Sequence, residues 1–338
     1  MSLTTHQYID RHSRQVRTER LFADRLVNFL YSEVREKTPS VFKAITSARG
    51  SSLLGLLNFE AMLGVRLRAN TEAVRSWGVD LSECLDDPDT LDTPGKLFTR
   101  KIRYWETRPM NPDPAAVVAP ADSRVLLGSF GAHSLLFIKE KFFTFHELLG
   151  DFKTRWLEAF KDGDYALCRL TPDKYHYVHT PVSGRVVDFY PIAGHYHSCN
   201  PGAVVNLVDP YSKNMRMVTI IDTDVTGGSG VGLVAVVEVV ALMVGEIRQR
   251  YSEEYYNDPQ PLMPGLMLKK GQPKSLFKPV SSTVVLLFQP GRLDFDQDLI
   301  DNQTSSNAVS RFSTGFGRPL VETEVRVREQ IGRAAARG

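Results

Sequence analysis

The chain has 338 residues, of which 42% are hydrophobic and 24% charged, and these fractions exclude an intrinsically disordered chain. The net charge of +2 is too small to indicate nucleic-acid binding, and we find no nucleic-acid-binding motif. Three scattered cysteines exclude a disulfide framework or a cysteine-based zinc site and fit a reducing compartment. Without a long apolar run or a signal-peptide pattern, we expect a cytoplasmic protein, either soluble or attached to a membrane face.

Helical spacing characterises the first part of the chain. Apolar residues recur at roughly helical spacing over residues 14–37, which predicts an amphipathic helix. Two further helices are expected over 52–63 and 71–77. An Asp-rich stretch with proline and glycine, residues 84–95, indicates a linker. We therefore predict a helical, possible membrane-associating region over residues 1–95.

Short runs of strand-forming residues follow the linker. One helix is expected over about 145–161, and I-, V- and L-rich runs separated by turns predict strands over 116–119, 124–127, 135–139, 185–190, 215–221, 232–240 and 283–288. We therefore predict an α+β fold, in which the helical region precedes a predominantly antiparallel β body over residues 96–338. That body would be sandwich-like or barrel-like, and it would carry the catalytic site.

Basic residues accompany the apolar residues of the predicted N-terminal helices. Helices of this kind could lie on an anionic membrane with their apolar side facing the bilayer. They could also pack on the body or on a second copy of the chain, with the basic residues in solvent, and interspersed acidic residues favour this commoner arrangement. The basic residues are Arg11, Arg14, Arg17, Arg20, Arg25, Lys43, Arg49, Arg66 and Arg68.

Adjacent serines lie directly before the apolar run 283–288. In a strained turn before a buried strand, the Ser282 hydroxyl could attack the carbonyl carbon of Ser281 and replace the peptide bond by an ester. β-Elimination of that ester would split the chain and leave dehydroalanine, which hydrolyses to an N-terminal pyruvoyl group. Its ketone could form a Schiff base with a substrate amine and act as an electron sink. Most Ser-Ser-Thr stretches are ordinary turns, so this interpretation depends on the rest of the chain.

A carboxylate and two histidines could activate this serine. Asp122 lies in a turn between two predicted strands, and His176 and His179 lie near another turn. An aspartate that orients an imidazole, which then takes the proton from Ser282, is the ordinary way to activate a hydroxyl. The alternatives are a turn-forming aspartate and two structural histidines.

A metal site is a further alternative for the histidines. His195 and His197 form an alternating pair, and together with His176 and His179 they could hold zinc or iron. No acidic ligand has a recognisable spacing to them, so we predict no metal.

Three motifs, in this order, resemble those of the phosphatidylserine decarboxylases, a pyruvoyl-dependent enzyme family. The Pro-Ala-Asp-Gly motif of the family is present as Pro-Ala-Asp-Ser over 120–123, and its Tyr-His-Arg-x-His-x-Pro-x-x-Gly motif covers 175–184. Its Gly-Ser-Thr motif is present as Ser-Ser-Thr over 281–283. Lesser matches lie at 98–100, 108–109, 138–139, 148–150, 198–201, 214–216, 244–247 and 268–271, and Tyr-Ile-Asp-Arg at 8–11 resembles a subset of the family.

The resemblance implies a role for each of these residues. Ser282 would be the cleavage nucleophile and the precursor of the pyruvoyl cofactor, with Asp122 and His179 completing a charge-relay triad. Cleavage between Ser281 and Ser282 would give a β chain of residues 1–281 and an α chain of residues 282–338. His176 would deliver a proton to the substrate carbon after carbon dioxide leaves.

The resemblance also implies a substrate and a place of action. The phospholipid phosphatidylserine would be converted to phosphatidylethanolamine at the cytoplasmic face of the cell membrane, with peripheral contact through the basic N-terminal helices. We expect the α and β chains to stay associated and the protein to form a homodimer. Two alternatives stay open, namely the same chemistry on a soluble aromatic amino acid and a non-catalytic homologue that is never cleaved.

Three positions depart from the family pattern. Ser281 replaces the glycine before the cleavage bond, Ser123 replaces a turn glycine, and Tyr177 replaces the arginine between the two histidines. Serine reaches some of the backbone conformations open to glycine only with strain, although the chemistry needs only the carbonyl of residue 281. The tyrosine removes a cation that could have met an anionic substrate.

Overall fold

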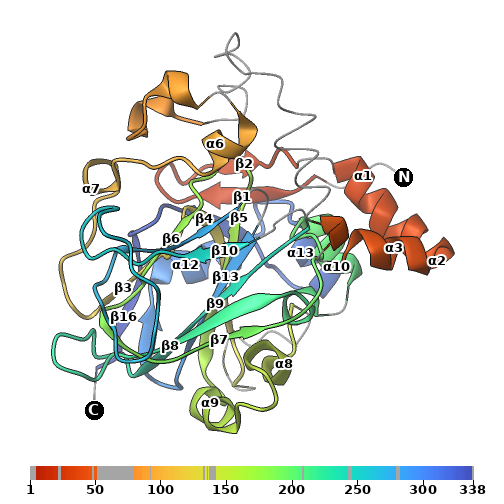
Figure 1. Cartoon of the computed structure of the whole chain (residues 1–338). Helices are drawn as coiled ribbons and strands as arrows, with labels where there is room; N and C mark the ends of the chain where they lie inside the picture. Colours follow the sequence, from red (N-terminus) through yellow and green to blue (C-terminus); the bar gives the residue numbers. More distant parts are fainter. Residues whose placement is uncertain are drawn as a thin grey trace.

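The computed structural model describes residues 5–21, 24–47, 49–51, 79–91, 93–131, 134, 136, 142–207, 209–242, 246–278 and 282–336. These residues form one ten-stranded sheet, two three-stranded sheets and a set of short helices (Figure 1). The predicted α+β fold is confirmed. The described strands form open sheets and no closed barrel.

The large sheet has strands from both ends of the chain. In spatial order they are β11 (Met267–Leu268), β7 (Gly184–Ile192), β8 (Arg216–Asp222), β9 (Leu233–Val239), β13 (Ser282–Phe288), β5 (Asp164–Leu170), β4 (Ser123–Ser129), β15 (Glu322–Val325), β1 (Gln7–Asp10) and β2 (Val16–Thr18). All pairings in this sheet are antiparallel except the parallel pair β1–β15.

Two small antiparallel sheets accompany the large one. The first consists of β10 (Ile247–Gln249), β12 (Pro273–Phe277) and β6 (Tyr177–His179). The second consists of β14 (Leu293–Phe295), β16 (Gln330–Ala334) and β3 (Ala116–Val118).

Strand β13 lies inside the large sheet between β9 and β5, and all seven of its residues are buried. Because side chains alternate along a strand, β13 contributes to a different core on each face of the sheet. Val284 and Leu286 belong to one core, which also contains residues of β6 and β12, whereas Val285 and Leu287 belong to the other. A strand that is covered on both faces has a continuous apolar sequence, which explains why the run was recognisable.

The helices are short. Those near the N-terminus are α1 (Asp24–Phe29), a π-helical turn η1 (Leu30–Val34), α2 (Arg35–Lys37) and α3 (Pro39–Ile45). They are followed by η4 (Leu81–Glu83), η5 (Pro88–Thr90), α6 (Pro94–Phe98), α7 (Tyr104–Thr107), α8 (Phe145–Leu149), α9 (Thr154–Phe160), α10 (Pro201–Asn206), α11 (Pro210–Lys213), α12 (Gln297–Gln303) and α13 (Arg311–Phe316). No helix of the described residues is long and apolar enough to cross a bilayer.

Two helix predictions need correction. Residues 14–37 are not one helix, because Val16–Thr18 form strand β2 and the helical part begins only at Asp24. Pairing of β2 with β1 outweighs the local helical spacing. The helix expected over 145–161 is two helices, α8 and α9, because Gly150 at the end of α8 has a φ of +88°.

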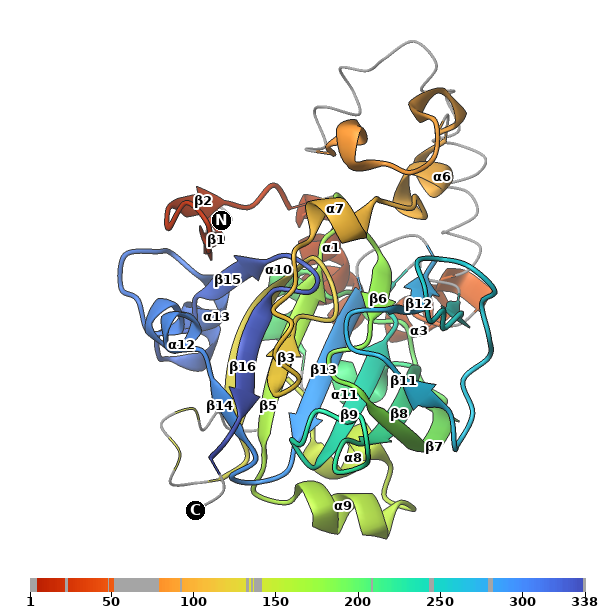
Figure 2. The ribbon, with the colours of Figure 1, turned by 90° about the vertical axis from the view of Figure 1, so that its left-hand side faces the viewer.

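Several other expectations concern residues outside those described. The helices over 52–63 and 71–77 lie there, as does most of the strand over 135–139. The division of the chain at residue 95 stays a prediction. Strands β1 and β2 precede that residue, and Figure 2 shows them (red) beside β15, α12 and α13 (blue) of the C-terminal part.

Candidate functional site

Ser282 is the first residue of β13, and it pairs with Leu170 at the end of β5. Strand alternation puts its side chain on the same face as Val284, toward the core that contains residues of β6 and β12. The Ser282 hydroxyl is buried and has no hydrogen-bond partner among the residues that the structure describes. A buried polar group without a partner costs free energy, which makes this hydroxyl a candidate reactive group, although eleven further buried side-chain atoms of the described residues also lack a partner.

The carboxylate of Asp122 is bound by an arginine and not by a histidine of the predicted triad. Arg108 donates to it from Nε at 3.1 Å and from Nη2 at 2.9 Å, and the Val327 amide donates to Oδ1 at 2.8 Å. Arg108 also binds both carboxylate oxygens of Glu83, each at 2.8 Å. Burial raises the pKa of Asp122, but the charge and hydrogen bonds of Arg108 outweigh it and hold the pKa below the ordinary value. Asp122 is therefore an anion at neutral pH.

Both ring nitrogens of His179, the last residue of β6, have partners. Nδ1 lies 2.9 Å from the Gly271 carbonyl oxygen, which can only accept, so Nδ1 carries the proton. Nε2 therefore accepts from the Tyr175 hydroxyl at 2.9 Å. Burial lowers the pKa of His179 to about 3, so the ring is neutral at physiological pH.

His176 has one ring nitrogen bound and one free. Its Nδ1 donates to the Lys174 carbonyl at 2.8 Å, and the ring stacks on Phe98 with 3.5 Å between ring centroids. Nε2 is buried without a hydrogen-bond partner and is therefore an unused acceptor. Burial lowers the pKa of His176 to about 3, so this ring is neutral as well.

The structure brings the predicted residues together only in part. The His179 amide donates to the Pro120 carbonyl at 2.7 Å, which holds β6 beside the segment of Asp122, and the charge of Asp122 opposes the lowering of the pKa of both His176 and His179. In the described part of the chain, the side chains of Asp122, His179 and Ser282 are not hydrogen-bonded to one another. Ser281 lies outside the described residues, so the catalytic assignments stay predictions.

Two partners of the site were not assigned from the sequence. Arg108 fixes Asp122, and Tyr175 fixes His179. Both lie in stretches that resemble the family, at 108–109 and 175–184, but the resemblance assigned neither residue a role. The Gly271 carbonyl, 92 residues from His179, lies in the lesser match at 268–271, which likewise assigned it no role.

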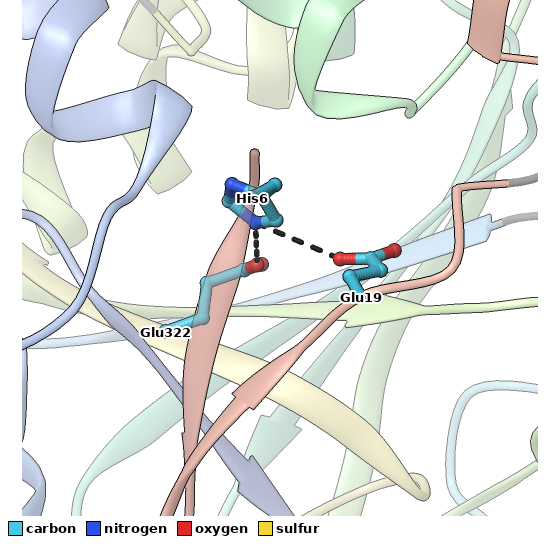
Figure 3. Close-up of side chains that lie close together, drawn as sticks. All are labelled: His6, Glu19 and Glu322. Carbon is cyan, nitrogen blue, oxygen red and sulfur yellow. Dashed lines mark hydrogen bonds and ion pairs between the residues drawn. The ribbon is translucent and has the colours of Figure 1, made fainter. Parts of the chain in front are cut away.

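One group of residues has the spacing of metal ligands, but its chemistry does not suit a metal. His6 Nε2 lies 2.8 Å from Glu322 and 3.6 Å from Glu19 (Figure 3). The Arg311 amide donates to His6 Nδ1, so Nε2 carries the proton and cannot ligate. Arg169 binds both glutamates, with its Nη2 at 2.7 Å from Glu19 and 2.6 Å from Glu322. We conclude that this is a buried ion-pair cluster.

The four histidines that were considered as ligands of zinc or iron do not gather. Among the described residues, the group of His6, Glu19 and Glu322 is alone in meeting the spacing of a metal site. His195 and His197 are neighbours, with 5.4 Å between ring centroids, but neither His176 nor His179 joins them.

Comparison with known proteins identifies the family. The family model described as phosphatidylserine decarboxylase matches residues 95–317, which include Asp122, both site histidines and Ser282. The chain belongs to the phosphatidylserine decarboxylase family. Membership in the phosphatidylserine decarboxylase family identifies it as a decarboxylase, that is, a carboxy-lyase.

Similar proteins are found in several bacteria, and each bears the name phosphatidylserine decarboxylase proenzyme. The protein of Bordetella petrii is 32% identical over 255 residues, which cover 69% of this chain and 84% of the relative. That of Anaeromyxobacter sp. strain K is 32% identical over 256 residues, which cover 72% and 86%. That of Chlamydia trachomatis is 29% identical over 333 residues, which cover 96% of each chain.

Proposed function

We propose that this family member cleaves itself between Ser281 and Ser282 and then converts phosphatidylserine to phosphatidylethanolamine and carbon dioxide. The observation that carries the proposal is the buried, unpartnered hydroxyl of Ser282 at the start of the central strand β13. Its products would be a large chain of residues 1–281 and a small chain of residues 282–338.

Self-cleavage needs a base for the Ser282 proton. A neutral His179 suits this role, because a ring with a pKa of about 3 is unprotonated at physiological pH. Its Nε2 would exchange the hydrogen bond of Tyr175 for that of Ser282, while Nδ1 keeps its bond to Gly271. Attack on the Ser281 carbonyl then forms an ester, and β-elimination releases the carboxylate of Ser281 as the new C-terminus of the large chain.

The dehydroalanine left at residue 282 would take up water and lose its nitrogen as ammonia to become the pyruvoyl group. The ketone of that group would accept the substrate amine and withdraw electrons from the bond to the departing carboxylate. The apolar core around β13 excludes water from this position. His176 has a neutral ring with a free Nε2, so this atom can take up a proton and return it to the substrate carbon.

A phospholipid substrate requires contact with a membrane. In support of such contact, α1 and α3 expose Phe29 (56%) and Val41 (48%), and Lys37 and Lys43 are exposed nearby. Apolar side chains with basic neighbours suit the surface of an anionic bilayer. We propose peripheral attachment at the cytoplasmic face of the membrane, with the protein as a homodimer.

The proposal is tested on the purified protein. Denaturing electrophoresis should show the loss of the 38.0 kDa chain and the appearance of a small fragment, and mass spectrometry should find an N-terminal pyruvoyl group on that fragment. Ser282→Ala should abolish cleavage, and continued processing in this variant would refute the assigned nucleophile. Release of carbon dioxide from phosphatidylserine vesicles, but not from free aromatic amino acids, would exclude the soluble substrate.

A further inference from the structure

Residues 5–19 are here called the N-terminal arm, and residues 6–12 of this arm contact residues 282–338. Strand β1 of the arm pairs in parallel with β15, with Tyr8 opposite Glu322 and Asp10 opposite Glu324. The amide of Gln7 donates to the Val309 carbonyl at 2.7 Å, and its side chain accepts from the Val309 amide at 2.8 Å. The arm thereby covers an edge of β15 that would otherwise be open.

Arg11 makes the densest set of contacts in the arm. Its guanidinium binds both carboxylate oxygens of Asp298, at 2.7 and 2.8 Å, and one oxygen of Asp296 at 2.9 Å. It also donates to the Gln330 carbonyl. All three partners belong to residues 282–338. Such a bidentate, charge-assisted arrangement is stronger than an ordinary surface ion pair.

The arm also binds a carboxylate of the same C-terminal part. Glu322 is fully buried, and His6 of the arm donates to it at 2.8 Å. Arg169 of β5 binds Glu322 on one side and Glu19 of the arm on the other, and Arg124 of β4 also pairs with Glu19. The two carboxylates, which Figure 3 shows beside His6, therefore balance the guanidinium groups of Arg169 and Arg124. Without Glu19, a buried positive charge would lack its partner.

We propose that the N-terminal arm is a retaining clasp for the small chain, an inference that rests on the self-cleavage proposed above. In the uncut protein these contacts lie within one chain. Once the bond before Ser282 is broken, they cross between two chains. Strand β13 anchors the start of the small chain inside the large sheet, and the arm holds the later part, from Asp296 to Gln330.

Cleavage changes how the strength of these contacts can be measured. Release of the small chain from a cut protein is a dissociation, so its midpoint in urea rises with protein concentration. The uncut Ser282→Ala protein cannot release the small chain, and its midpoint does not depend on concentration. Comparing the processed protein with the uncut Ser282→Ala protein therefore distinguishes loss of the small chain from unfolding.

The test uses the processed protein with Arg11→Ala and a matched control, Arg17→Ala. Arg17 lies on the same arm in β2, carries the same charge and is exposed. Urea is increased stepwise, and size-exclusion chromatography measures the small chain that remains bound. We expect Arg11→Ala to raise the dissociation constant about tenfold, which corresponds to about 1.4 kcal/mol, whereas Arg17→Ala retains the small chain like the wild type.

Two results would overturn the inference in distinguishable ways. If the wild type is cut and Arg11→Ala holds the small chain as tightly as Arg17→Ala, the clasp is refuted and the proposed function stands. A wild-type chain that is never cut refutes both. Hydrogen exchange of the Ser282→Ala protein provides the control for folding: adding Arg11→Ala should speed exchange at β15 and the start of α12 and leave β8 and β9 protected.

Discussion

Arg108 binds both carboxylate oxygens of Asp122 and, with its remaining donors, both oxygens of Glu83. The arginine is thus shared between a predicted catalytic carboxylate and a residue of η4, which lies before the predicted domain boundary. The geometry assigns Arg108 the task of keeping Asp122 charged and fixed in place, although it was not among the predicted site residues.

Arg108→Ala should destabilise the protein strongly, because it leaves Asp122 as a buried, unpaired carboxylate. Breaking a buried pair by removing one partner costs about 3–5 kcal/mol of unfolding free energy. Urea unfolding in the Ser282→Ala background measures this cost without interference from cleavage. Arg333→Ala is the control, because Arg333 is exposed and has only a long contact to Asp113, at 3.5 Å. Equal losses in the two variants would contradict the role of Arg108.

The neutral histidines predict a loss of stability in mild acid. Burial lowers the pKa of His176 and His179 from 6.5 to about 3. As the pH falls below 6.5, both histidines bind protons in the unfolded chain but stay neutral in the folded protein. The free energy of unfolding therefore falls until the pH reaches about 3. For each histidine the loss at pH 4.5 is about 3 kcal/mol.

Urea unfolding of the Ser282→Ala protein at pH 7 and pH 4.5 measures this loss. In His179→Gln the loss between the two pH values should be smaller by about 3 kcal/mol. His12→Gln, at an exposed histidine outside the candidate site, is the matched control. An unchanged pH dependence in His179→Gln would show that His179 is not a neutral buried group.

Tyr175→Phe tests the hydrogen bond that occupies His179. Because the Tyr175 hydroxyl and Ser282 would compete for Nε2 of the ring, removal of the hydroxyl should leave self-cleavage as fast as in the wild type or faster. Stability should fall by about 1–3 kcal/mol, since the buried Nε2 loses its donor. The rate is measured by electrophoresis after synthesis of the chain in a cell-free system. Markedly slower cleavage would mean that the tyrosine is needed to orient the ring.

A second buried ion pair, between Glu238 of β9 and Lys274 of β12, predicts a non-additive double mutant. Both side chains are fully buried, with Lys274 Nζ 2.7 Å from Glu238, and a β-bulge directs Lys274 and Ser275 toward the same carboxylate. Glu238→Gln or Lys274→Met alone should cost about 3–5 kcal/mol, because one buried charge remains unpaired. The double variant should cost less than either single one in urea unfolding. Simple additivity would refute the pairing.

Local sequence predicted strands that contain an apolar run, including those with a buried charge at Arg124, Arg216 or Glu238, and it missed β5 and β12. The run over 283–288 was recognised because β13 is apolar on both faces. Strand β5 was missed, since Arg169 interrupts its apolar pattern, and the partners of that arginine, Glu19 and Glu322, lie about 150 residues away in either direction. Strand β12 contains Lys274 and Ser275, whose buried partner Glu238 lies 36 and 37 residues away in the sequence.

In the candidate site too, some residues could be predicted from the sequence and others could not. Asp122, His176, His179 and Ser282 could be picked from motifs, because each motif is a continuous stretch of sequence. Their surroundings could not, since the groups that set protonation come from elsewhere in the chain: Arg108 for Asp122 and the Gly271 carbonyl for His179. Protonation follows from three-dimensional contacts, and these contacts were not visible in the motifs.

The place of β13 in the large sheet also determines when the protein can mature. A ribosome makes β5 and β9 long before β13, yet in the sheet β13 lies between them. The two halves of the sheet therefore cannot join until synthesis has passed residue 288. Ser282 becomes buried only at that moment, so a nascent chain should be unable to cleave itself earlier. Self-cleavage would therefore occur only in chains whose sheet is complete.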